Sequence, residues 1–210
     1  MTATLPSDKQ KADEIIKSLR IESVLQKTDE SLDVKPYIQE TKTEWINIEL
    51  PLDIKAIQTC LKLALDERYT QLRKNGIQLS IENKSLSALL RVRQYVLTQN
   101  RRSAKPLFTA IRITYALNIL EAHGITPFLK FSERTRKKKG AGVKELFETD
   151  PNFTRAIQLS NIAHSKGIEH SKIPKLLEIV SSVKDKVLIF TSYRDSVNVI
   201  NEKLNEIGIK

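Results

Sequence analysis

The 210-residue sequence contains a single cysteine, Cys60, so no internal disulfide can form and a reducing compartment is expected. Six glycines and seven prolines exclude collagen-like and low-complexity chains. No apolar run approaches the roughly 20 residues that a membrane span needs, and the first residues lack the basic and apolar regions of a secretion signal. We therefore expect a soluble, unexported protein that is cytoplasmic or associated with the nucleoid.

Motifs of self-contained catalysis are also missing. The sequence has no G-x-x-x-x-G-K-[ST] or G-x-G-x-x-G loop for a nucleotide, and no G-x-S-x-G turn for a serine nucleophile. His123, His164 and His170 lack the spacing of zinc ligands, so we interpret them as surface or capping residues. Cys60 falls on the apolar face of an expected helix and is interpreted as a core residue. We predict no catalytic residue, no metal site and no ATPase activity for this chain alone.

The sequence does have enough apolar residues for a folded core. Hydrophobic residues make up 40% and charged residues 29% of the chain, a balance that excludes an intrinsically disordered protein. The length of 210 residues fits either one large domain or one domain with fragments of its neighbours.

Positive charge is concentrated in one segment. The chain has 35 Lys and Arg against 25 Asp and Glu, a net charge of +10. Residues 91–139 hold twelve of the cations and only two acids, Glu121 and Glu133, so this segment alone accounts for the surplus. Its cations are Arg91, Arg93, Arg101, Arg102, Lys105, Arg112, Lys130, Arg134, Arg136, Lys137, Lys138 and Lys139. Such a focused field attracts nucleic acid, although a run such as Arg136–Lys139 is equally typical of a solvated helix face.

Apolar residues recur with helical spacing over most of the chain. The expected helices cover about 8–20, 52–75, 86–99, 104–122, 128–139, 152–166, 173–183 and 195–207. Gly140-Ala141-Gly142 is interpreted as either a hinge or a helix break. Strands are expected near 23–26, as one or two strands within 35–50, and as a fully buried strand over 187–190. The expected fold is mainly α, a helical bundle flanked by incomplete α/β pieces.

Four segments resemble, in order and spacing, sequences of one family. They are Thr2–Lys9, Asp33–Ile38, Ile168–Lys172 and Val187–Asp195. The first resembles motif III and the last resembles motif IV of the archaeal Hef helicases, which are relatives of the FANCM and XPF branch of superfamily 2. The four matches together are more specific than any one of them.

The resemblance implies a piece of a helicase motor. Residues 1–51 would be the C-terminal part of the first RecA-like domain, residues 52–168 a thumb-like helical insert, and residues 169–210 the start of the second RecA-like domain. Motif III would comprise Thr2, Ala3 and Thr4, and motif IV would comprise Phe190, Thr191, Tyr193 and Arg194. The family's Walker A loop, DEAH-type box and C-terminal arginine motif have no counterpart, so we expect the middle of a helicase. It would hold no cofactor itself, while ATP and Mg²⁺ would act in the intact enzyme.

The resemblance and the charge indicate one role. The insert is expected to bind double-stranded or forked DNA for a helicase of DNA repair and stalled-fork processing, with the twelve cations contacting phosphates and the rest of the motor as its partner. Two alternatives stay open: a basic module that docks an acidic protein through exposed Phe128 and Phe131, and an RNA-binding protein. Thr191 and Arg194 would contact the nucleic-acid backbone, or Thr191-Ser192 would cap the following helix.

Overall fold

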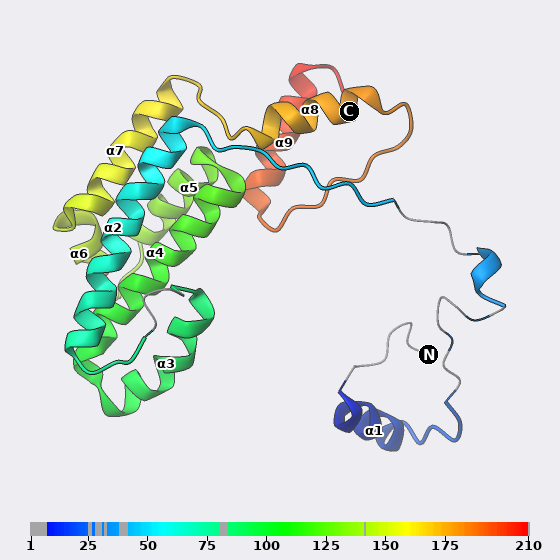
Figure 1. The fold of residues 1–210 in the computed structure, drawn as a ribbon, viewed down its shortest axis with the longest axis horizontal. Helices are drawn as coiled ribbons and strands as arrows, with labels where there is room; N and C mark the ends of the chain where they lie inside the picture. The colour runs from blue at the N-terminus through cyan, green and yellow to red at the C-terminus, as the bar shows by residue number, and fades with distance from the viewer. Residues whose placement is uncertain are drawn as a thin grey trace. The chain divides into compact units, whose positions relative to one another are not determined.

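The computed structural model describes residues 8–24, 27, 31, 33–37, 42–79, 84–140 and 142–209. The chain divides into two compact units, Met1–Ile46 and Asn47–Lys210. All regular structure in the described residues is helical (Figure 1). The prediction of a mainly α fold is therefore confirmed.

The first unit contains helix α1, Lys9–Ser18, and the short 3-10 helix η1, Lys35–Tyr37. Helix α1 begins close to its predicted start because Asp8 caps it: the backbone N–H of Gln10 donates to the Asp8 carboxylate at 3.0 Å. This bond satisfies one of the backbone donors that a helix leaves free in its first turn. Trp45, near the end of this unit, is 85% exposed.

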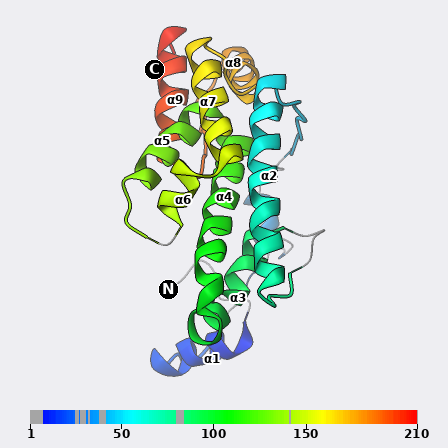
Figure 2. The ribbon, with the colours of Figure 1, turned by 90° about the vertical axis from the view of Figure 1, so that its left-hand side faces the viewer.

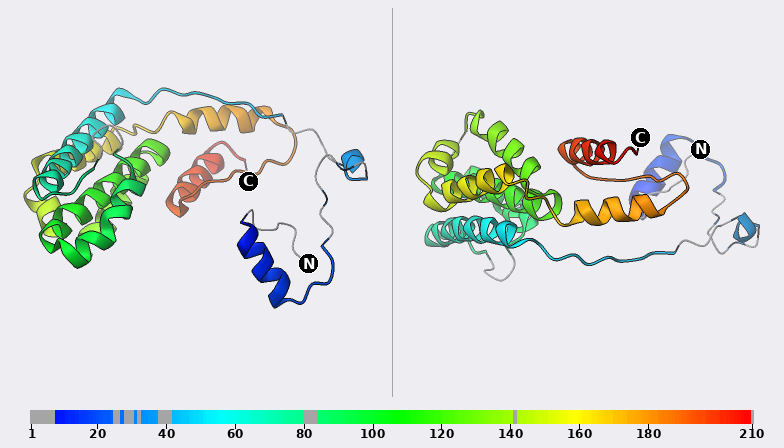
Figure 3. Two further views of the ribbon diagram at one scale, coloured as in Figure 1. Left: turned by 60° about the horizontal axis from the view of Figure 1, so that its bottom comes forward. Right: turned by 90° about the horizontal axis from the view of Figure 1, so that it is seen from above.

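The second unit is a helical bundle followed by a helix pair. Its elements are α2 (Leu52–Lys74), α3 (Leu86–Gln99), η2 (Arg101–Ser103), α4 (Ala104–His123), α5 (Ile125–Arg136), α6 (Val143–Glu148), α7 (Pro151–Ser165), α8 (Lys172–Ser182) and α9 (Arg194–Glu206). Helices α2, α4 and α7 run side by side along the bundle (Figure 2). Helices α8 and α9 pack on each other beyond the end of the bundle where α4 meets α5 (Figure 3).

Helix α4 is the centre of the bundle, because apolar residues surround most of its axis. Leu107, Ala110, Ile113, Ala116 and Leu120 are completely buried. The helix packs against α2, α3 and α5. Burying one Leu or Ile side chain contributes about 1.5–3 kcal/mol to folding. The stability of the bundle therefore depends more on α4 than on a helix whose side chains are mostly exposed.

A single residue joins α4 to α5. Gly124 has a φ of +88°, a left-handed conformation that glycine adopts without strain. A Cβ at this position would lie only 2.9 Å from the Cβ of His170. Helix α5 therefore begins at Ile125, earlier than expected, with Pro127 in its first turn.

A second glycine fixes the end of the segment after α5. Gly142 has a φ of +77° and is the N-cap of α6, a six-residue helix that the sequence pattern did not predict. A Cβ at Gly142 would overlap the Thr109 hydroxyl of α4. This close approach favours a helix break over a hinge at residues 140–142, of which Ala141 lies outside the described residues.

The expected strands are not formed in the part of the chain that the structure describes. Residues 23–24, 42–50 and 187–190 are irregular and residues 35–37 form η1, while residues 25–26 and 38–41 lie outside the described part. Leu188 is 81% exposed and Phe190 89% exposed, so the prediction of a buried strand over 187–190 is wrong. An apolar strand needs a neighbouring strand to pair its backbone and bury its faces, and no described segment provides one.

Candidate nucleic-acid interface

A cleft of about 400 Å³ lies between α4 and α5. Helix α4 lines it along one stripe, α5 forms the opposite wall, and Tyr193, the residue before α9, completes it. The lining residues are Phe108, Ile111, Arg112, Tyr115, Ile119, Phe131, Thr135, Lys138 and Tyr193. The walls are mainly apolar and aromatic, and the lining contains two cations and no acidic residue.

Two predicted phosphate-binding residues are associated with this cleft: Arg112 of α4 lines it, and Arg93 of α3 contacts the lining residue Phe108. The Arg93 guanidinium lies 5.9 Å from the centre of the Phe108 ring, within the range of a cation–π interaction. Arg112 is half-buried, and its desolvation lowers the pKa of its guanidinium. An arginine remains charged despite such a shift, so Arg112 brings positive charge to the cleft wall.

The tail of α5, residues Arg136–Lys139, is an uninterrupted run of four cations. All four side chains are exposed. None forms an ion pair with any residue that the structure describes, and neither does exposed Arg91 of α3. Lys138 also lines the α4–α5 cleft. This tail is therefore available to phosphate.

Arg101 and Arg102 lie at the end of the bundle formed by η2 and the C-terminus of α2. The Arg102 guanidinium donates to the backbone carbonyl of Asn75 at 3.3 Å, and the Asn100 amide donates to the same oxygen at 2.9 Å. Arg73 and Lys74 occupy the last turn of α2 at this end. These two cations were missed because they precede the basic segment, although cations in a last turn also complement the helix dipole.

Three of the twelve predicted cations lie near carboxylates, although the side chains of Lys105 and Arg134 stay more than half exposed. Lys105 pairs with Glu145 at 2.6 Å. Arg134 donates two hydrogen bonds to Asp195, at 3.2 and 2.5 Å, and this pair raises the pKa of Arg134 and lowers that of Asp195. Lys130 also acts on the Asp195 carboxylate through its charge. These cations are less available to phosphate than those of the α5 tail.

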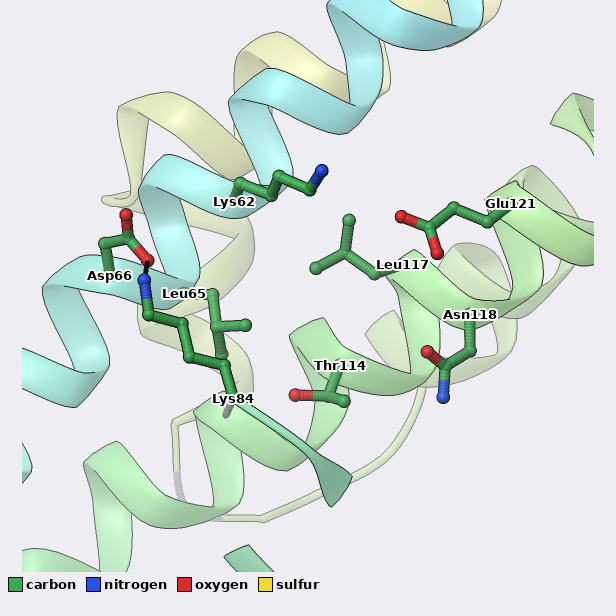
Figure 4. Close-up of a pocket in the computed structure, with 8 residues that line it drawn as sticks. All are labelled: Lys62, Leu65, Asp66, Lys84, Thr114, Leu117, Asn118 and Glu121. Atoms are coloured by element: carbon green, nitrogen blue, oxygen red, sulfur yellow. Dashed lines mark hydrogen bonds and ion pairs between the residues drawn. The ribbon is translucent and has the colours of Figure 1, made fainter. Parts of the chain in front are cut away.

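A second cleft, of about 350 Å³, lies on the other side of α4, toward α2 (Figure 4). It is lined by Lys62, Leu65, Asp66, Lys84, Thr114, Leu117, Asn118 and Glu121. Lys84 forms an ion pair with Asp66, and the Gln58 amide donates to the Glu121 carboxylate at 2.5 Å. Because the lining holds as many carboxylates as cations and Lys84 is already paired with Asp66, the α2–α4 cleft is a poor site for phosphate.

Motif IV adjoins the bundle through His123. The His123 ring packs edge-on against Tyr193 with ring centres 4.6 Å apart, and its Nδ1 lies 2.8 Å from the Ser196 hydroxyl. Burial lowers the pKa of His123, and the charge of Lys172 adds to this shift. Tyr193, not Thr191 or Ser192, is the N-cap of α9, and no side chain caps that helix. The capping alternative for Thr191-Ser192 is therefore wrong.

His170 is buried, so its interpretation as a surface residue is wrong, while its hydrogen bonds at the end of α4 and at the start of α8 agree with the capping alternative. It is 4% exposed. The Nε2 atom lies 2.9 Å from the Glu121 carbonyl oxygen, and the Lys172 backbone N–H donates to Nδ1 at 3.1 Å. An Nδ1 that accepts a hydrogen bond carries no proton, so these two partners fit the neutral ring. Burial lowers the pKa of His170 accordingly.

Several other predicted features receive a definite place. Phe128 is completely buried in the core, so the expected exposed Phe128–Phe131 anchor is wrong. Phe190 and Arg194 of motif IV are exposed. Thr2, Ala3 and Thr4 lie outside the described residues. No helix in the described ranges is long and apolar enough to cross a membrane.

Comparisons with known proteins bear on the predicted resemblance. No protein-family profile matches the chain. The whole chain is 28% identical to a Methanocaldococcus jannaschii protein named as an ATP-dependent RNA helicase. Over 99% of its length it is 27% identical to the DEAD-box ATP-dependent RNA helicase FANCM of Arabidopsis thaliana, and over 98% it is 23% identical to the ATP-dependent DNA helicase MPH1 of Pyricularia oryzae.

A solved structure shows the same fold. The helicase domain of Pyrococcus furiosus Hef matches all of this chain with a TM-score of 0.70 at 23% sequence identity. The chain covers 47% of that domain, and 28%, 17% and 21% of the three relatives above. The predicted resemblance to the Hef and FANCM helicases of superfamily 2 is thereby confirmed, over part of their length.

Proposed function

We propose that this chain contains the DNA-binding insert of a superfamily 2 DNA helicase of repair and stalled-fork processing, which holds double-stranded or forked DNA through phosphate contacts. The observation that carries the proposal is the α5 tail: four exposed cations without an ion pair to any described residue, next to the cationic α4–α5 cleft. Phosphate contacts position a protein on DNA without reading its sequence, so the proposed recognition is of DNA shape.

The proposal divides the chain into three parts. Residues 52–168 are the insert, and residues 1–51 and 169–210 belong to the two motor domains. ATP and Mg²⁺ are handled by the rest of the motor, because this sequence has no Walker A loop. A role on chromosomal DNA is consistent with the expected association with the nucleoid.

Salt-dependent binding tests the proposal. We would titrate the chain into labelled forked, continuous duplex and single-stranded DNA and follow fluorescence anisotropy between 50 and 200 mM salt. If about six phosphates are contacted, binding should weaken by roughly a thousandfold over this range. The Arg101→Ala/Arg102→Ala variant should reduce the slope of log affinity against log salt by about two. A matched Lys62→Ala/Lys166→Ala variant, which removes exposed cations elsewhere, should keep the wild-type slope, and a salt-independent affinity would refute the proposal.

Double-stranded RNA is the second candidate substrate, because two relatives are named RNA helicases and a third is named a DNA helicase. The same titration with an RNA duplex of equal sequence separates the two, since RNA presents 2′-hydroxyls and a different groove geometry. Tighter binding to RNA than to every DNA form would replace DNA with RNA in the proposal.

A further inference from the structure

Resting on the proposed function, we propose that the α4–α5 cleft holds one unpaired nucleotide of branched DNA. Its base would lie against the aromatic walls and its phosphate on Arg112 and Lys138. Forked DNA offers such nucleotides where its strands separate. The cleft would then distinguish a junction from continuous duplex by binding an unpaired base. Phosphate contacts alone can distinguish the two only through the shape of the DNA backbone.

The aromatic side chains provide the surface for a base. Phe108 and Tyr115 lie seven residues apart on α4 and so share one side of that helix, and Phe131 and Tyr193 line the cleft with them. Tyr115 is 37% exposed, so part of its ring is open to solvent. Stacking of a base on an aromatic side chain contributes about 1–3 kcal/mol and tolerates any base, because every base has a π face.

The charge of the cleft restricts the occupant further. Arg112 and Lys138 line the cleft, and Arg93 lies over the ring of the lining residue Phe108. A purely apolar ligand would desolvate Lys138, which forms no ion pair with any described residue, while a phosphate alone would leave the aromatic walls exposed. A nucleotide joins a flat apolar group to an anion and satisfies both parts of the cleft.

The α2–α4 cleft shows that size alone does not create such a site. Its volume of about 350 Å³ is close to the 400 Å³ of the α4–α5 cleft. It has no aromatic lining, and Asp66 and Glu121 would repel a phosphate. Asn118, which projects from α4 on that side (Figure 4), therefore provides a matched control for a substitution of Tyr115.

The energetic cost of occupying the cleft differs between substrates. Removing a base from a continuous duplex costs a few kcal/mol of pairing and stacking, and that cost is smallest for a base that is already unpaired. The free energy gained by stacking is of similar size. In duplex DNA the cost of removing the base offsets this gain, whereas in a fork the base is already unpaired and the gain is retained. The expected result is a preference for forked DNA that persists when salt weakens the phosphate contacts.

The test compares protein variants with DNA lesions. Affinity for a fork and for continuous duplex would be measured for the 210-residue chain with Tyr115→Ala, Tyr115→Phe and Asn118→Ala. Loss of one stack should weaken fork binding by roughly 5- to 150-fold in Tyr115→Ala, with duplex binding unchanged. Tyr115→Phe and Asn118→Ala should bind like wild type. An abasic site moved through the first unpaired nucleotides of each arm should cause a similar loss at one position, and that loss should vanish in Tyr115→Ala.

Each outcome has a distinct meaning. Fork binding that survives both Tyr115→Ala and every abasic position overturns the base site and leaves the proposed function standing. A Tyr115→Ala variant that weakens fork and duplex equally also overturns it, because Tyr115 then acts only on the fold. If Tyr115→Ala fails to fold, the abasic series on the wild-type chain decides. Absence of binding to any DNA overturns the proposed function and the base site together.

Discussion

Charged residues have different surroundings on the two sides of α4. Toward α2 and α7, Arg68 is 3% exposed and its guanidinium lies 2.5 Å from the completely buried carboxylate of Asp150, with Glu145 at 3.5 Å. Toward α5, Arg112 and Lys138 line a cleft without an acidic residue. Charges on the first side hold helices of the bundle together, while Lys138 on the second side is exposed and forms no ion pair with any residue that the structure describes. A net charge counted along the chain does not separate these two cases.

Removing a buried charge on the α2 side should have the largest effect. We expect Arg68→Ala to lower the free energy of unfolding by about 3–5 kcal/mol, because it leaves the Asp150 carboxylate buried without its partner. Asp150 also caps α7 by accepting a hydrogen bond from the Phe153 backbone N–H at 2.8 Å. Denaturant unfolding would measure the loss, and Arg155→Ala, an exposed arginine of α7, is the control. Equal unfolding midpoints for the two variants would contradict the structural role of this pair.

Removing exposed charges on the α5 side should alter binding and leave stability unchanged. We expect Lys137→Ala/Lys138→Ala/Lys139→Ala to reduce the slope of log affinity against log salt by about three, because each lysine would neutralise one phosphate. Its unfolding free energy should stay within about 0.5 kcal/mol of wild type, as is usual for exposed residues. Anisotropy titrations and denaturant unfolding measure the two quantities. A stability loss as large as that of Arg68→Ala would remove the distinction between the two sides.

Acidification should lower the stability of the folded state through His123 and His170, and this is the smallest of the three expected effects. Burial lowers the pKa values of His123 and His170, so the folded state favours their neutral forms. Their contribution to stability is complete above the unfolded value of about 6.5 and is lost as the pH falls below it. The slope is at most about 1.4 kcal/mol per pH unit for each histidine. Unfolding of wild type and His170→Gln between pH 7.5 and 5 measures it; parallel curves would exclude a contribution from His170.

The helices could be predicted because their signals are local. Asp8, Ser85 and Asp150 cap α1, α3 and α7 through bonds to residues two or three positions away. Gly124 ends α4 as predicted from the sequence. The expected strands failed for the opposite reason, since a strand exists only with a partner, and no described segment supplies one. Helix α6 has six residues, too few to show a periodic pattern.

The site could be predicted only in part. The twelve cations were found by composition, but their availability depends on contacts between distant residues. Arg134 meets Asp195, which lies 61 positions away, and Lys105 meets Glu145 across 40 positions. The grouping of Phe108, Phe131 and Tyr193 around one cleft likewise follows from packing between helices. No periodicity along the chain contains that information.

The joint at Gly124 has a mechanical consequence. Because one residue connects α4 to α5, with His170 packed against it, the two helices behave as a single bent rod and not as two pieces on a flexible linker. The separation of the helices near the bend is then set by geometry that a ligand cannot easily change. The α4–α5 cleft therefore has a fixed width before any ligand binds, and it admits only a group whose thickness matches that width.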